Sequence, residues 1–232
     1  MATTTTTAIP ATYRAYRYTQ FGDALDVLSL DSGIVHAPLQ QPSHVRVKIH
    51  SAALSPADYK IVTIGEYFFT KHPIEPPYLI GFDFAGTIVE VGAGVTSYQV
   101  GDTVYGMMSA DGFGTFAEYV ALDTQFIAKK PESLSFVQAA GIPLVSLTSY
   151  QALVDHGKVK EGSRVLILGG SSGTGIAAVQ IAKALGAHVI TTTSSRNAEF
   201  VKSLGADEIV DYTSEKWADV IAPNSLDAIY DC

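Results

Sequence analysis

The segment from residue 164 to residue 196 constrains the fold of this chain more than any other part of it. A strand-like segment at 164–168, apolar from 165 onward, leads into a turn at 169–175 that holds four glycines, and a second strand-like segment follows at 188–192. The stretch between them, 174–185, is typical of a helix. A strand, a glycine-rich turn, a helix and a second strand form one unit in which the helix N-terminus presents backbone N–H groups to an anion. The segment therefore predicts an α/β fold with a site for the pyrophosphate of a dinucleotide. A tight turn without a ligand is the alternative.

The turn supplies the first candidate cofactor-binding residues. It departs from a strict G-x-G-x-x-G pattern, because Ser172 stands where a glycine is common. Gly173 and Gly175 still allow the backbone to approach a phosphate and the helix to pack closely on the strand, and the hydroxyl side chains add donors. The candidates are Gly170, Ser171, Ser172, Gly173, Thr174 and Gly175.

The end of the second strand indicates which dinucleotide is bound. Proteins that favour NADH usually carry Asp or Glu at this point, because a carboxylate accepts a hydrogen bond from the ribose 2′-hydroxyl group. This chain has Ser194, Ser195 and Arg196 instead, and these side chains can donate to a 2′-phosphate. We therefore expect NADPH rather than NADH, with Asn197 in the same candidate set. A solvated residue at a helix start is the alternative for Arg196.

Composition and charge argue against several other classes of function. The chain has 232 residues, of which 47% are hydrophobic, and a net charge of −8, which argues against a nucleic-acid partner. A single cysteine, Cys232, excludes an internal disulfide and a multi-cysteine zinc site. The single cysteine fits a reducing compartment, so we expect a cytoplasmic protein, and no apolar run has the length of a membrane span. The Thr-rich residues 1–12 predict a flexible tail, with a transit peptide as the weaker alternative.

Turn signals divide the rest of the chain into two domains. Between 13 and 130, short strands such as 45–49 and 84–91 alternate with glycine-rich corners, which indicates a compact β-barrel. The remainder, 131–232, begins with a broken helical stretch at 135–154 and then alternates strand and helix, which predicts a parallel sheet. Its expected strands are 164–168, 188–192, 208–210 and 227–230, fewer than the roughly six of a complete dinucleotide-binding fold, and its helices are 174–185, 197–204 and 215–221. This domain therefore looks truncated.

Several segments resemble the medium-chain dehydrogenase/reductase superfamily, in the order in which that family places them. They are 52–60, 81–92, 100–106, 116–120, 144–153, 182–187 and 204–212, together with the glycine turn. The resemblance implies an N-terminal GroES-like β-barrel domain joined to a Rossmann NAD(P)-binding domain, with the active cleft between them.

Within that superfamily the chain is similar to the zinc-free quinone oxidoreductase and enoyl reductase branch. Zinc-dependent relatives place a cysteine where this chain has Leu54, Ser55 and Pro56, and a His-Glu pair where it has Phe82 and Asp83. A catalytic zinc ion needs such ligands to converge on one site. We therefore expect no metal.

Reduction of a conjugated carbonyl without a metal needs a group that stabilises the developing enolate oxygen and a source of a proton. The segment around Asp58 and Lys60 resembles the family's stretch beside the nicotinamide, which implies both as cofactor contacts. Lys60 is the first catalytic candidate, because an ammonium group donates three hydrogen bonds. Tyr67 resembles a tyrosine of the reductases and is the second, although Ser55 departs from the family's asparagine. An exposed lysine and a packed tyrosine are the alternatives.

The resemblance also implies two further cofactor contacts. Thr148 resembles a threonine near the nicotinamide, and Tyr212 resembles a tyrosine of the adenosine phosphate pocket. A hydroxyl on a bridging helix and an aromatic residue at a strand end are the competing interpretations.

The expected function is NADPH-dependent reduction of quinones or α,β-unsaturated carbonyl compounds by hydride transfer. The alternatives are a trans-acting enoyl reductase, a one-electron quinone reductase, and an NADPH-binding protein without effective catalysis. The expected partner is a small-molecule quinone or enone, with neither nucleic acid nor membrane. A homo-oligomer is left open.

Overall fold

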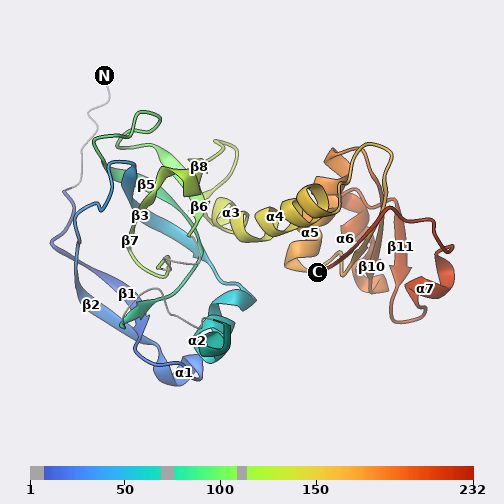
Figure 1. Cartoon of the computed structure of the whole chain (residues 1–232), viewed down its shortest axis with the longest axis horizontal. Helices are drawn as coiled ribbons and strands as arrows, with labels where there is room; N and C mark the ends of the chain where they lie inside the picture. The colour runs from blue at the N-terminus through green and yellow to red at the C-terminus, as the bar shows by residue number, and fades with distance from the viewer. Residues whose placement is uncertain (1–7, 69–75, 109–113) are drawn as a thin grey trace. The chain divides into compact units, whose positions relative to one another are not determined.

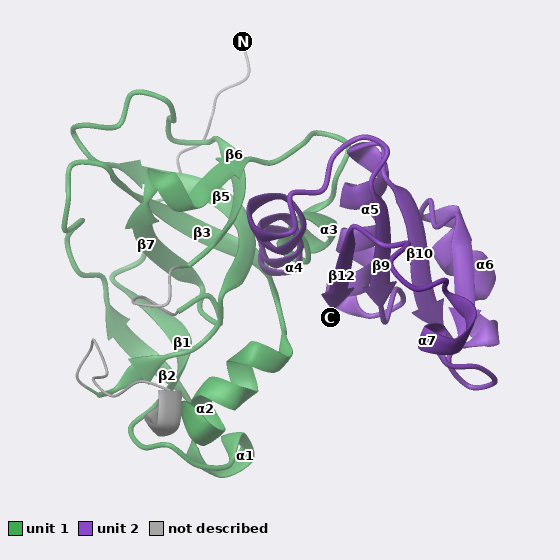
Figure 2. Ribbon diagram, turned by 45° about the vertical axis from the view of Figure 1, so that its right-hand side comes forward, with its two compact units in different colours: residues 1–143 green, residues 144–232 purple. Residues whose placement is uncertain are grey.

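The computed structural model describes residues 8–68, 76–108 and 114–232, and within these the side chains of residues 66–68 are left undescribed (Figure 1). The chain forms two compact units, residues 1–143 and 144–232 (Figure 2). Most of the predicted flexible tail falls on residues 1–7, outside the described residues, and the first strand already begins at Thr12.

The first unit is built around an antiparallel five-stranded sheet. Its inward-facing side chains, among them Val45, Val47, Phe84, Ile88 and Val104, form a fully buried core. Period-two alternation predicted the strand at 45–49, and a more continuous apolar run predicted the one at 84–91; both are confirmed within longer strands. The strand order is β7 (Tyr119–Asp123), β3 (His44–Ala53), β5 (Asp83–Val91), β6 (Thr103–Met107) and β8 (Ile127–Lys129).

A smaller sheet and two helices complete the outer part of this unit. Strand β1 (Thr12–Tyr18) pairs with β2 (Ser29–Val35) on one side and with β4 (Tyr78–Leu79) on the other. Helix α1 (Ala24–Val27) is short, a 3₁₀ turn covers Thr124–Phe126, and α2 (Pro56–Phe68) has a kink at Ile64. A cluster of buried side chains packs the small sheet against α2; it consists of Tyr18, Val62 and Ile80.

The predicted helical stretch at 135–154 is helical and broken where expected, near Pro143. Helix α3 (Phe136–Ala140) starts with a capping box between Ser135 and Gln138. It is followed by α4 (Pro143–Tyr150) and a π-helical segment at Gln151–His156. Ala139 and Ala140 pack against Ala85 of β5, and the first unit accordingly extends to residue 143, beyond the predicted domain boundary at residue 130.

The second unit is a parallel sheet covered by helices, as the alternating pattern predicted. Its strands are β9 (Arg164–Leu168), β10 (His188–Thr193), β11 (Glu208–Asp211) and β12 (Ala228–Asp231). The connecting helices are α5 (Gly173–Ala184), α6 (Ala198–Ser203) and α7 (Trp217–Val220), with a 3₁₀ turn at Ser195–Asn197 before α6. The strand order is β11-β10-β9-β12, so β10 and then β11 lie on one side of β9 and β12 lies on the other (Figure 2). Ligands of open α/β sheets bind at such a reversal, beyond the carboxyl ends of the strands.

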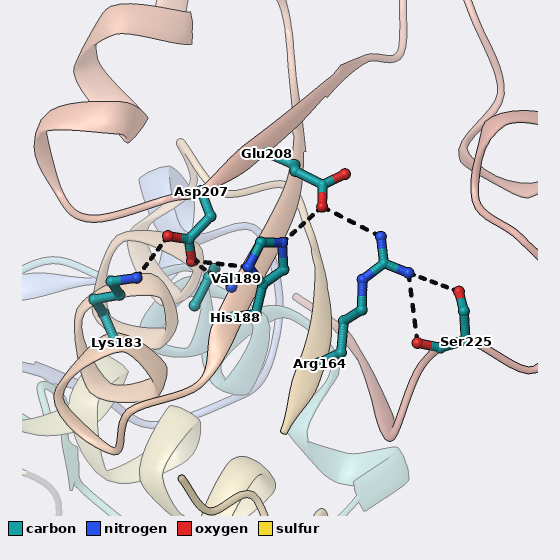
Figure 3. Close-up of polar contacts among 7 residues, drawn as sticks. All are labelled: Arg164, Lys183, His188, Val189, Asp207, Glu208 and Ser225. Carbon is teal, nitrogen blue, oxygen red and sulfur yellow. Dashed lines mark hydrogen bonds and ion pairs between the residues drawn. The ribbon is translucent and has the colours of Figure 1, made fainter. Parts of the chain in front are cut away.

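Charged side chains join the opposite, amino ends of the same strands (Figure 3). His188 Nε2 lies 2.6 Å and Arg164 Nη2 lies 3.2 Å from Glu208 Oε1, and Lys183 Nζ lies 2.6 Å from Asp207 Oδ1. The hydrogen bond to His188 lowers the pKa of Glu208. Burial alone would raise the pKa of Asp207, but the bonds from Lys183 and a backbone N–H outweigh it and the pKa is lowered. The network therefore stabilises the sheet at the end away from the glycine turn.

No helix in the described part of the chain combines the length and the apolar character that crossing a membrane requires.

Candidate dinucleotide-binding site

The glycine turn lies where the strand order reverses, directly after β9 and beside the end of β12. Gly169 has a φ of +77°, a left-handed conformation that favours glycine. The Gly169 N–H donates to Thr192 Oγ1 at 2.9 Å, and the Gly170 N–H donates to the Thr192 carbonyl at 3.0 Å. Ser172 then caps α5, since its Oγ accepts from the Gly175 N–H at 3.0 Å. The neighbouring strand and the cap together fix the shape of the turn.

The glycines of this turn serve different purposes. A Cβ atom on Gly170 would lie 2.1 Å from Thr191 Oγ1, and one on Gly175 would lie 2.1 Å from the Gly169 carbonyl oxygen. Packing inside the protein therefore requires both glycines. A Cβ on Gly173 would meet nothing nearer than Val145 Cγ1, at 3.6 Å, which is an ordinary contact. The protein itself therefore does not need a glycine at 173, and a small side chain there would make only that ordinary contact.

The start of α5 offers donors to an anion at the same place. The N–H groups of Gly173 and Thr174 stand in the first turn, where a helix supplies no acceptor. The hydroxyl groups of Ser172 and Thr174 lie within hydrogen-bonding reach of the Cys232 thiol, which follows β12. Burial raises the pKa of Cys232, and those hydroxyl groups partly oppose the shift. This arrangement fits a phosphate, which accepts several hydrogen bonds at a helix N-terminus.

The loop predicted to contact the ribose, residues 194–197, directly follows β10 and is called the ribose-reading loop. Arg196 is exposed, and its guanidinium has no hydrogen bond or ion pair with any described residue. Ser194 starts the 3₁₀ turn without a side-chain cap, and Tyr212 is 63% exposed beyond the end of β11. Ser195 is exposed, and its N–H donates to Asp211 Oδ2 at 3.0 Å.

Sequence reasoning missed Asp211, which contacts this loop from the end of the neighbouring strand β11. It ends β11 and pairs in register with Thr193 of β10, so the parallel strands bring an acid to a loop whose own sequence has none. Its carboxylate also accepts from the Thr213 hydroxyl at 2.6 Å and the Thr213 N–H at 2.9 Å, and these bonds lower its pKa. The predicted pairing of the two strands was the signal that could have revealed it. An ionised group at this position opposes a 2′-phosphate, although its oxygens are already bonded to protein donors.

Helix α4 carries a second missed residue. The predicted contact Thr148 is exposed on this helix, whereas its neighbour Ser149 is fully buried and donates to the Thr174 carbonyl at 2.9 Å. Ser149 therefore attaches α4 to the first turn of α5. The helical period could have indicated that Ser149 is buried where Thr148 is exposed, but it could not have indicated that the Ser149 hydroxyl group donates to Thr174.

The first unit holds the catalytic candidates. Lys60 is exposed on α2, and no described residue bonds to its ammonium group. Asp58 is buried, and its Oδ2 accepts the Ser55 N–H at 2.7 Å while the Asp58 N–H donates to the Ser55 carbonyl at 3.1 Å. Burial raises the pKa of Asp58, partly offset by hydrogen bonds from Ser55 and from the backbone of Phe82. The bonds between Asp58 and Ser55 thus hold the first turn of α2. Tyr67 lies outside the described side chains.

Within residues 8–68, 76–108 and 114–232, no three His, Cys, Asp or Glu side chains converge in a way that could hold a metal ion.

Comparison with known proteins agrees with this architecture. Residues 41–132 match the family model of the alcohol dehydrogenase GroES-like domain, and residues 173–232 match that of the zinc-binding dehydrogenase. A 2-methylene-furan-3-one reductase of Solanum lycopersicum is 39% identical over 99% of this chain and 59% of its own length. An NADPH-dependent alkenal/one oxidoreductase of Arabidopsis thaliana, named as chloroplastic, is 36% identical over 97% of this chain and 58% of its own. The chain thus spans about three fifths of these curated relatives.

The solved structure of a quinone oxidoreductase from Coxiella burnetii superposes with a TM-score of 0.82 and 36% identity. The match covers 94% of this chain and 68% of that one. Both units and the order of their elements are shared with such proteins. The chain belongs to the medium-chain dehydrogenase/reductase superfamily, in its quinone oxidoreductase branch.

Proposed function

We propose that this chain binds NADPH and reduces quinones or α,β-unsaturated carbonyl compounds by hydride transfer without zinc. The observation that carries the proposal is the glycine turn at the end of β9, which leads into the start of α5, where the first N–H groups have no acceptor within the helix. Bound NADPH would supply the hydride. The names of the relatives, which include an alkenal/one oxidoreductase and a quinone oxidoreductase, support the substrate class.

The residues of the second unit would hold and select the cofactor. The first N–H groups of α5, with the hydroxyl groups of Ser172 and Thr174, would bind the pyrophosphate. The unpaired guanidinium of Arg196 would bind the 2′-phosphate, because an arginine donates to phosphate through two N–H groups at once. This contact is the reason for preferring NADPH, and it has to outweigh the nearby carboxylate of Asp211.

The residues of the first unit would act on the substrate. When a hydride reaches the electrophilic carbon of an enone, negative charge develops on the carbonyl oxygen. The Lys60 ammonium, which has no acceptor in the described protein, is available to stabilise that oxygen. Tyr67 is the second candidate for this role. Leu54 and Phe82 stand where zinc-dependent relatives carry metal ligands, and this supports a reaction without zinc.

Cofactor preference is tested by measuring dissociation constants for NADPH and NADH with the wild-type protein and with Arg196→Ala. We expect tighter NADPH binding in the wild type, and a loss of that preference in the variant without a change in NADH affinity. The matched control is Lys202→Ala, which removes a positive charge from α6 that pairs with Glu199. Equal wild-type affinities for the two cofactors would refute the preference.

Catalysis is tested by following NADPH absorbance after addition of 9,10-phenanthrenequinone or a simple enone. Lys60→Ala should lower kcat, because the substitution removes charge stabilisation on the substrate. Unchanged turnover in both Lys60→Ala and Tyr67→Phe would remove these residues from the mechanism. A semiquinone radical detected by spin resonance would indicate one-electron reduction instead.

NADPH binding without oxidation of the cofactor in the presence of either substrate would refute the catalytic part of the proposal. A cytoplasmic location and a homo-oligomer stay predictions.

A further inference from the structure

The Ser171 hydroxyl group receives two hydrogen bonds from neighbouring side chains. Thr193 Oγ1 donates to Ser171 Oγ at 3.0 Å, and Asn197 Nδ2 donates to the same oxygen at 3.3 Å. Ser171 belongs to the glycine turn, Thr193 is the last residue of β10, and Asn197 ends the 3₁₀ turn before α6. Three segments that are separate in the sequence therefore meet at one hydroxyl group.

The burial of Thr193 shows why its hydrogen bond to Ser171 matters. The residue is fully buried at the end of β10, where a valine would have nearly the same shape. A buried hydroxyl group costs free energy unless it is hydrogen-bonded. Within the described part of the chain its side-chain hydrogen bond is the one to Ser171. Its orientation is therefore set by that acceptor.

The Asn197 side chain does not cap the helix that follows it. It stands at the N-cap position of α6, where an asparagine side chain usually accepts a hydrogen bond from the first helical N–H groups. No such bond forms here, and the amide donates to Ser171 instead. The helix thus goes without a side-chain cap while the turn gains a donor.

These two bonds determine where the Ser171 proton can point. A hydroxyl oxygen has two acceptor positions and one proton, and here both acceptor positions are occupied by Thr193 and Asn197. The remaining O–H group is free to donate, and Ser171 is only partly buried, so a ligand can reach it. An O–H donor held towards an anion makes one of the stronger hydrogen bonds found in proteins.

We propose that Thr193 and Asn197 are positioning residues that fix the Ser171 hydroxyl group as a donor to a phosphate oxygen in the ADP half of the dinucleotide. The inference rests on the proposed function, because it assumes that a dinucleotide occupies the turn. It adds Thr193 to the site, gives the candidate Asn197 a positioning role in place of a direct contact, and joins the turn to the ribose-reading loop.

The test compares Thr193→Val, which removes the hydroxyl group, with Thr193→Ser, which keeps it. Dissociation constants for NADPH and NADH are measured by titration, and thermal unfolding is measured without ligand. Thr193→Val should raise the dissociation constant about threefold to tenfold, the size of one lost hydrogen bond, and Thr193→Ser should restore wild-type binding. In a Ser171→Ala background, Thr193→Val should have no further effect on binding, because the group it positions is gone. An equal loss for both cofactors identifies the pyrophosphate as the acceptor, and a loss for NADPH alone identifies the 2′-phosphate.

Two outcomes overturn the inference while leaving the proposed function intact. One is wild-type affinity in Thr193→Val despite a lower melting temperature, which would make Thr193 merely structural. The other is an equal effect of Thr193→Val with and without Ser171, which would show that it acts elsewhere. If the wild-type protein binds neither NADPH nor NADH, the proposed function fails and this inference fails with it.

Discussion

Gly173→Ala is expected to abolish tight cofactor binding without harming the fold. The added Cβ would lie 3.6 Å from Val145 Cγ1, and Gly173 has no left-handed φ, so the protein can accept a methyl group there. A glycine-to-alanine change in a compatible conformation stabilises a protein by about 0.4–1 kcal/mol, because the unfolded chain loses freedom. The same methyl group would stand where a phosphate must approach the N–H groups of α5. Losing one charge-assisted hydrogen bond costs about 1.5–3 kcal/mol, which corresponds to about 10- to 150-fold weaker binding.

Gly175→Ala is the matched control, since its Cβ would lie 2.1 Å from the Gly169 carbonyl oxygen and 2.8 Å from Gly170 Cα. Such a contact forces the helix away from the strand and should cost about 1–3 kcal/mol of stability. The assays are urea unfolding of both variants and titration with NADPH. Unchanged NADPH affinity in Gly173→Ala would refute the assignment of this turn as the phosphate site. Equal stability of the two variants would refute the packing argument.

Three further predictions concern the surroundings of the site. Asp211→Asn should tighten NADPH binding several-fold and leave NADH binding unchanged, because it removes a negative charge near the ribose-reading loop; titration with both cofactors checks this. Alkylation of Cys232, the single thiol of the chain, should be slowed by NADPH, because the cofactor would cover the neighbouring Ser172 and Thr174; intact mass measured against time gives the rates, and equal rates with and without NADPH would contradict the prediction. Glu208 has a lowered pKa in the folded protein, so its contribution to stability is present above its unfolded pKa of about 4.3 and is lost as the pH falls through the lower folded value. Glu208→Gln should therefore reduce stability at neutral pH and flatten the dependence on acid, as urea unfolding at about pH 7 and about pH 3.5 would show.

The second unit was the more predictable of the two. The bounds of β9 agree with the expected 164–168. Helix α5 differs from expectation by one residue at each end and β10 by one residue at its C-terminal end, because hydrophobic periodicity and the glycine turn are local signals. Strand β2 and the short α1 carry weaker patterns and were not expected. The expected helix at 215–221 shortens to the four residues of α7.

The polar contacts of the site were less predictable than its backbone. Ser149, Thr193 and Asp211 act through partners 16 to 25 residues away in the sequence, which only the packed sheet brings within reach. Asp58 was expected at the cofactor, but its environment is that of a buried carboxylate at the start of α2. A motif indicates which residue types stand near a site, whereas the direction of each side chain depends on its tertiary neighbours.

The hydrogen bonds between Thr192 and the glycine turn affect the free energy of cofactor binding. Thr192 holds the N–H groups of Gly169 and Gly170 from the neighbouring strand in the protein alone. Ordering the backbone of one residue costs about 1–2 kcal/mol, and here that cost is met during folding rather than when the ligand arrives. The amide protons of Gly169 and Gly170 should accordingly exchange slowly with solvent before any cofactor is added. Affinity would then depend on how firmly β10 stays paired with β9, so substitutions deep in the sheet could weaken binding without touching the ligand.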